Sequence, residues 1–122
     1  MDSESMELAK KYLGKEVEVI IDRPLGSRHP EYPDCVYPIN AGYVPNTTAP
    51  DGEELDVYYL GINKPIDKAT GVAVAVIHRL NDDDDKLVVV PAEVSFTNEE
   101  IEKLIEFQEK YFRYVIIREQ ID

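Results

Sequence analysis

The chain has 122 residues, of which 43% are hydrophobic and 31% are charged, and its formal net charge is −12. This length suits one domain with a buried core, and we expect residues 1–122 to form it. The acidity argues against binding to nucleic acid or to an anionic membrane, because either polyanion would be repelled. It leaves open a small phosphate substrate whose charge is neutralised by metal ions.

Nothing in the sequence predicts export or a membrane anchor. No apolar run approaches the roughly 20 residues needed to span a bilayer, and the polar segment Met1–Lys11 lacks the apolar core of an export signal. Cys35 is the only cysteine, so an intrachain disulfide is excluded and a packed loop thiol is expected. These features predict a cytoplasmic protein.

The first part of the sequence predicts one strand and a long loop. Residues 1–12 are expected to form a short helical or partly flexible lead-in. Glu16–Ile21 alternates charged and apolar residues, as a half-buried strand does. Asp22–Pro50 contains six prolines, which exclude long helices and leave only short strand pieces. Loops of this length are usually functional or disordered, and the tyrosines and valines of this one favour a packed, functional loop.

Three strands are predicted next. Leu55–Gly61 is an apolar run followed by a turn that contains a proline. Gly71–Leu80 and Lys86–Pro91 are rich in valine and are joined by a short acidic link, which is typical of a hairpin.

A helix and a final strand complete the prediction. Thr97 and Glu100 form a capping box that begins a helix ending near Phe112. Tyr114–Arg118 is expected to be the last strand. We therefore expect a mainly β (α+β) fold, a small five-stranded OB-like barrel with one main C-terminal helix.

An acidic segment before the Leu55 strand has the spacing of a cation site. Asp51, Glu53 and Asp56 surround Gly52. Alternate residues of an extended segment point to the same side, and a turn at the glycine would bring the third carboxylate back to the other two. Mg²⁺ takes oxygen ligands and keeps water or phosphate in its other positions. A solvated turn before a strand explains the same residues.

A second acidic run, Asp82–Asp85, lies at the predicted hairpin tip, where a solvated turn is again the alternative. Converging carboxylates repel one another unless a cation compensates them, so two clusters in one small barrel favour a shared ion pocket. Lys86 follows the run directly, and Arg28 lies in a turn-like segment. Cations beside a carboxylate cage suit phosphate binding, because metals cover only part of the substrate charge. Each cation also fits a plain surface role.

Other side chains either extend this hypothesis or exclude rivals. Tyr37, Tyr43 and Tyr111 could donate hydroxyl hydrogen bonds to phosphate, and each also fits a core or rim position. His29 and His78 have no His or Cys neighbour at zinc spacing. The sequence lacks the Gly-x-x-x-x-Gly-Lys-Ser/Thr loop that binds nucleotide phosphates.

Two segments in order resemble the signature of soluble (family I) inorganic pyrophosphatases. Tyr37-Pro-Ile-Asn-Ala-Gly-Tyr43 is similar to the family's Tyr-Pro-x-Asn-Tyr-Gly-Tyr, and Asp51-Gly-Glu-Glu-Leu-Asp56-Val is similar to its Asp-Gly-Asp-Pro-x-Asp-Val. Asp82–Lys86 before a Val-Pro strand and Phe107–Tyr111 in the helix continue the similarity. The family's five-stranded barrel agrees with the elements predicted above.

The resemblance implies Mg²⁺-dependent hydrolysis of inorganic pyrophosphate by a metal-activated water, with Mn²⁺ as the alternative ion. It implies metal ligands at Asp51, Glu53, Asp56, Asp82 and Asp84. Asp56 would also orient the attacking water, and Lys86, Tyr37 and Tyr111 would contact phosphate. Asp22 would stand in for an outer glutamate of the family's first strand.

The chain departs from the family pattern where phosphate is bound. It is shorter, lacks an Asp-Arg before the tyrosine loop, and has Ala41, Glu54 and Phe112 where the family has Tyr, Pro and Lys. Arg28 or Arg23 would then supply the missing cation. Two alternatives stay open, a related hydrolase of another phosphoanhydride and a non-catalytic metal-binding barrel. Because family members often associate, the resemblance also admits a homo-oligomer.

Overall fold

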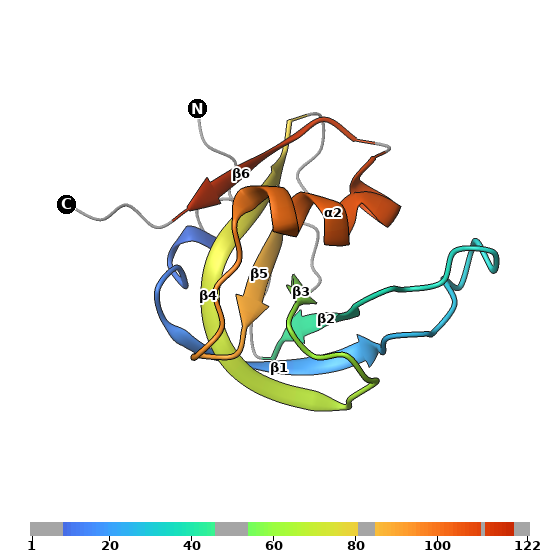
Figure 1. The fold of residues 1–122 in the computed structure, drawn as a ribbon, viewed down its shortest axis with the longest axis horizontal. Coiled ribbons are helices and arrows are strands. Elements are labelled where there is room, and N and C mark those ends of the chain that lie inside the picture. The colour runs from blue at the N-terminus through green and yellow to red at the C-terminus, as the bar shows by residue number, and fades with distance from the viewer. Residues whose placement is uncertain (1–8, 46–53, 81–84, 111, 119–122) are drawn as a thin grey trace.

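The strands of the computed structural model form one sheet that closes on itself (Figure 1). The structure describes residues 9–45, 54–80, 85–110 and 112–118. The strands pair in the order β1-β2-β3-β5-β4-β6, and β1 also pairs with β4, so five strands close a barrel that β6 extends. They are β1 (Glu16–Arg23), β2 (Asn40–Val44), β3 (Leu55–Tyr59), β4 (Lys68–Arg79), β5 (Lys86–Val90) and β6 (Tyr114–Arg118). The predicted mainly β fold with a five-stranded barrel is confirmed.

The barrel is mixed, because β3 and β5 are parallel whereas the other pairs are antiparallel. The predicted hairpin is confirmed by the antiparallel register of β4 and β5, in which Ile77 lies opposite Lys86. In the parallel pair, Asp56 of β3 lies beside Lys86 of β5. Two residues that are distant in the sequence therefore meet at one level of the barrel.

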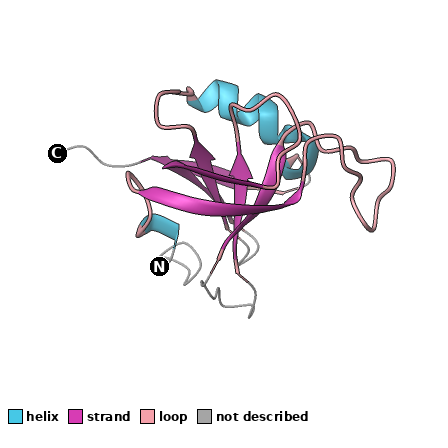
Figure 2. Cartoon of the chain, turned by 90° about the horizontal axis from the view of Figure 1, so that it is seen from below, coloured by secondary structure: helices cyan, strands magenta, loops and turns pink. Residues whose placement is uncertain are grey.

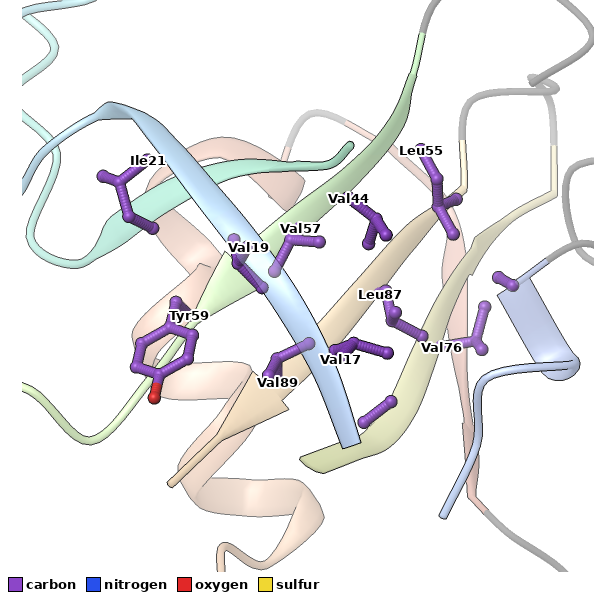
Figure 3. Close-up of a cluster of buried hydrophobic side chains, with 12 residues drawn as sticks. Val17, Val19, Ile21, Val44, Leu55, Val57, Tyr59, Val76, Leu87 and Val89 are labelled. Carbon is purple, nitrogen blue, oxygen red and sulfur yellow. The ribbon is translucent and has the colours of Figure 1, made fainter. Parts of the chain in front are cut away.

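Alternation along the strands separates two hydrophobic clusters. In β1, Val17, Val19 and Ile21 are buried whereas Glu16, Glu18 and Asp22 are exposed. The inward residues meet Leu55, Val57, Leu87 and Val89 from β3 and β5 in the barrel interior (Figure 3). A period of two residues places every second side chain on the other face. Tyr58 and Val88 therefore belong to a second cluster outside the barrel wall.

Strand β4 is longer than the predicted Gly71–Leu80, because its first residues pair with β1 and its later ones with β5 and β6. The register shifts between Ala73 and Ala75, as at a β-bulge, which bends a strand. A Cβ atom on Gly71 would lie 2.4 Å from the Val90 carbonyl oxygen. Only glycine permits this approach, which closes the barrel at that corner.

The helix α2 (Asn98–Glu109) covers the second cluster and lies on one side of the sheet (Figure 2). The predicted capping box is present, because the Glu100 amide donates to Thr97 Oγ1 and the Thr97 amide donates to Glu100 Oε1. Ile101 and Ile105 are fully buried on the face toward the barrel. The helix ends before the predicted Phe112. Among the described residues, none forms a helix long and apolar enough to cross a membrane.

Candidate active site

A polar pocket of about 180 Å³ opens where the outer barrel wall meets the C-terminal part of α2. Asp22 and Arg23 come from β1, Asp56 and Tyr58 from β3, Lys86 from β5 and Gln108 from α2. The remaining lining residues are Tyr37, Ala41, Gly42 and Val57. The pocket therefore gathers charged groups of both signs from three strands, and α2 adds a neutral amide.

The ion pair of Asp56 and Lys86 lies at the centre of this pocket's chemistry. Lys86 Nζ lies 2.9 Å from Asp56 Oδ2, and the side chains are 8% and 44% exposed. The Asp56 carboxylate is thus open to solvent while the lysine is nearly enclosed, with its ammonium 6.0 Å from the Tyr58 ring centre. A cation held this way can neutralise an incoming anion without moving far, which suits preorganised binding of phosphate.

Tyr37 adds a protonated hydroxyl to the pocket. Its side chain is buried, and burial raises the pKa of the phenol, although the nearby cations Arg23 and Lys86 oppose that shift. The hydroxyl therefore keeps its proton at neutral pH and can donate a hydrogen bond to an anion.

The loop that carries Tyr37 is anchored by Asn40, which is fully buried. Asn40 Oδ1 accepts from the Leu25 and Ile66 amides, and Nδ2 donates to the Lys64 carbonyl oxygen. Further along β2, a Cβ atom on Gly42 would lie 1.8 Å from the Ile20 carbonyl oxygen. Packing and hydrogen bonding therefore explain the Asn and the Gly of the tyrosine motif.

The structure brings together some of the predicted site residues and not others. Asp56, Lys86 and Tyr37 share the pocket with Asp22. Arg28 does not line it, because its Nη1 donates to the Pro33 carbonyl oxygen at 2.9 Å in the loop beyond β1. The arginine that lines the pocket is Arg23. The other predicted residues, Asp51, Glu53, Asp82, Asp84 and Tyr111, lie outside the described residues.

The oxygen atoms that line the pocket are of the kind that bind a hard divalent cation. Asp56 and Asp22 present carboxylate oxygens, which Mg²⁺ prefers, and none of the described residues that line the pocket carries a thiol or an imidazole. In the described ranges no group of three or more acidic, His or Cys side chains is preassembled to hold a metal. The other predicted ligands belong to the segments 51–53 and 82–84, outside the described residues.

Asp85, the last residue of the acidic run, has a structural role. Its side chain is fully buried, and both carboxylate oxygens lie 3.1 Å from His78 Nδ1. One of them also accepts from the Arg79 backbone amide at 3.1 Å. These bonds fix the start of β5 against the end of β4, and hence the position of the adjacent Lys86.

A buried ionic network beneath the pocket was missed by sequence reasoning. Arg79 donates to Glu109 through Nε at 2.9 Å and through Nη2 at 2.6 Å, and Tyr58 Oη donates to Glu109 Oε2 at 2.6 Å. The Arg79 and Glu109 side chains are 3% and 0% exposed. The Phe112 ring centre lies 3.7 Å from the guanidinium carbon. The network ties the last turn of α2, next to Gln108, to the barrel wall.

The same network predicts loss of stability in alkali. Burial raises the pKa of Tyr58 well above its usual value, and the Glu109 charge raises it further. The unfolded tyrosine loses its proton first, so the free energy of unfolding should fall as the pH rises above about 10, at up to about 1.4 kcal/mol per pH unit. Urea unfolding between pH 9 and 11.5 would measure this, and Tyr58→Phe should show a shallower fall. Tyr32→Phe, which removes an exposed hydroxyl, is the control; an equal slope in all three proteins would contradict the prediction.

Comparisons with known proteins identify the family and the fold. The family model described as inorganic pyrophosphatase matches residues 3–116. No curated protein matches the chain. Among solved structures, the inorganic pyrophosphatase of Ehrlichia chaffeensis is similar with a TM-score of 0.63 and 22% identity, over 84% of each chain. The Helicobacter pylori enzyme has a TM-score of 0.64 and 20% identity over 85% of each chain.

A third similar structure, the inorganic pyrophosphatase of Neisseria gonorrhoeae, has a TM-score of 0.64 and 23% identity, over 80% of this chain and 74% of that one. At these identities the structural matches establish the shared barrel, whereas the family model covers almost the whole sequence. The barrel, the mixed-charge pocket and the family match lead to one conclusion. This chain belongs to the inorganic pyrophosphatase family of hydrolases.

Proposed function

We propose that the protein hydrolyses inorganic pyrophosphate to two phosphates in a Mg²⁺-dependent reaction. The observation that carries the proposal is the Asp56–Lys86 pair at the polar pocket, because it places a solvent-open carboxylate beside an enclosed cation. Phosphoanhydride hydrolysis needs a group that orients the attacking water. It also needs positive charge that stabilises the phosphate oxygens.

Mg²⁺ would be held by oxygen ligands from Asp51, Glu53, Asp56, Asp82 and Asp84, with Mn²⁺ as the alternative ion. When bound, the metal would lower the pKa of a water molecule and stabilise charge on the phosphate oxygens. The position of Asp56 supports the assignment, because its side chain lines the pocket and is 44% exposed to solvent.

The chain's own residues position the reactants. Asp56 accepts a hydrogen bond from the attacking water and orients it. Lys86 weakens its ion pair with Asp56 and binds the leaving phosphate. Tyr37 donates a hydrogen bond from its hydroxyl to a phosphate oxygen. Arg23 lines the pocket on the side of β1 and supplies the cation that the family's missing arginine would give. Tyr111 remains a predicted phosphate contact.

The test is phosphate release from pyrophosphate measured with malachite green. We expect turnover with Mg²⁺ and a loss of at least about 100-fold after chelation with EDTA, since the metal contributes several kcal/mol to transition-state stabilisation. Adding Mg²⁺ back should restore the rate. A melting temperature raised by Mg²⁺ without phosphate release would instead identify a non-catalytic metal-binding barrel.

The composition and charge bear on where the protein acts and on what it binds. We propose one catalytic domain over residues 1–122 that acts in the cytoplasm on a small phosphate substrate and not on nucleic acid or membranes. The net charge of −12 supports the exclusion of nucleic acid and anionic membranes, because it repels polyanions. Homo-oligomer formation, also proposed, is testable by light scattering.

A further inference from the structure

A second pocket adjoins the polar one and has a different character. It measures about 780 Å³ and lies between the loop of residues 29–36 and the end of α2, where Figure 1 shows the loop projecting beyond the barrel. Ring side chains from both sides line it, namely His29 and Tyr32 of the loop and Phe107 and Phe112 at the helix. Gln108 lines both pockets, so the two adjoin at this side chain.

The two pockets suit ligand groups of different size. Small-molecule sites usually have volumes of about 300–1,000 Å³ and mostly apolar walls with a few polar groups. The polar pocket, at about 180 Å³, is below that range and matches a small anion. The second, at about 780 Å³, is large enough for a nucleoside.

The aromatic side chains connect the pockets physically. The Tyr37 ring, which lines the polar pocket, stacks on His29 with centres 6.3 Å apart and 14° between planes. Phe107 meets Tyr37 edge-on at 5.2 Å, and Tyr32 meets His29 at 5.1 Å. A continuous row of rings thus leads from the anion site into the larger pocket.

Part of the exposed apolar surface lies at the larger pocket. Tyr32 is 65% exposed, Val36 is 46% exposed and Phe112 is 38% exposed, and all three line it. Lys110 and Asp34 add one group of each charge to the lining. Exposed rings with a few polar groups suit a flat heterocycle, whose faces stack and whose edge makes hydrogen bonds.

We propose that the second pocket binds the base of a nucleoside diphosphate whose terminal phosphates occupy the polar pocket. The proposal rests on the proposed hydrolytic function and extends its substrate class. Water oxygen bonds to the terminal phosphorus, and the bond from that phosphorus to the bridging oxygen breaks with its electron pair retained by the nucleoside monophosphate. The products are the monophosphate, inorganic phosphate and a released proton.

Cys35 provides a reporter of binding that is independent of turnover. It is the only cysteine of the chain and lines the second pocket. With Mg²⁺ present, saturating ADP should slow alkylation of Cys35 by iodoacetamide at least about fivefold, because a base that fills the pocket shields the thiol from the reagent. Pyrophosphate, which fills only the polar pocket, should change the rate less than about twofold. An unchanged alkylation rate with ADP overturns the proposal.

A pair of Tyr32 variants tests the stacking contact. Tyr32→Ala should lower kcat/KM for ADP at least about fivefold and leave kcat/KM for pyrophosphate unchanged, whereas Tyr32→Phe keeps the ring and the activity. Protection of Cys35 without phosphate release from ADP overturns the assignment of ADP as substrate. If pyrophosphate itself is not hydrolysed, the proposed function fails, while protection of Cys35 by ADP still supports the base site.

Discussion

An Asp56→Asn variant should hydrolyse pyrophosphate about 10²–10⁴-fold more slowly than the wild-type protein, the usual contribution of a positioned acid–base group. Asparagine keeps the size of the side chain but loses the negative charge and one acceptor oxygen. The carboxylate is 44% exposed and lies on the outer barrel wall, so the substitution should leave the fold intact. Phosphate release at saturating Mg²⁺ and pyrophosphate would measure the loss as a change in kcat.

Asp67→Asn is the matched control, because Asp67 is an exposed aspartate that does not line the polar pocket. It should retain wild-type kcat. Equal rates for Asp56→Asn and wild type would remove Asp56 from the mechanism. A loss confined to KM would indicate that Asp56 contributes to binding of metal or substrate and not to the chemical step.

Local patterns of the sequence predicted most elements of the fold. Alternation identified β1, the valine runs identified β4 and β5, and the Thr97 capping box identified the start of α2. The pairing of β1 with the first half of β4 was not predictable in the same way. It depends on the close approach at Gly71 and on a bulge, which are tertiary features that periodicity does not encode.

The candidate site was predicted by residue type better than by geometry. Asp56 and Lys86 were expected to act together, and the parallel register of β3 and β5 places them side by side. For the arginine, the sequence favoured Arg28, with Arg23 as the alternative. The structure separates them because Arg23 ends β1 at the pocket, whereas Arg28 is already in the projecting loop.

The buried network had a signal in the sequence. Glu109 continues the spacing of the buried Ile101 and Ile105, so a charge falls on the apolar face of α2. Arg79 lies on the same buried face of β4 as Ala75 and Ile77, because the three are spaced two residues apart. A charged residue on each of two apolar faces suggests a buried pair, but which strand faces the helix had to come from the structure.

Removing the cation of this network should have the largest effect on stability. An Arg79→Met variant should lose about 3–5 kcal/mol of unfolding free energy, because it leaves the fully buried Glu109 carboxylate without its bidentate partner. That is a large part of the 5–15 kcal/mol typical of a native domain. Urea unfolding followed by circular dichroism would measure it.

A second variant separates the buried charge from packing. Arg79→Met combined with Glu109→Leu should recover most of the loss, because apolar side chains of similar volume often replace a buried ion pair at little cost. Tyr58 would then lose its acceptor at Glu109, which limits the recovery by about 1 kcal/mol. If the double variant were as unstable as Arg79→Met alone, the loss would come from packing against Phe112 and not from an unpaired charge. Since Gln108 precedes Glu109 and lines both pockets, a recovered fold with weakened substrate binding would show that the network also positions the site.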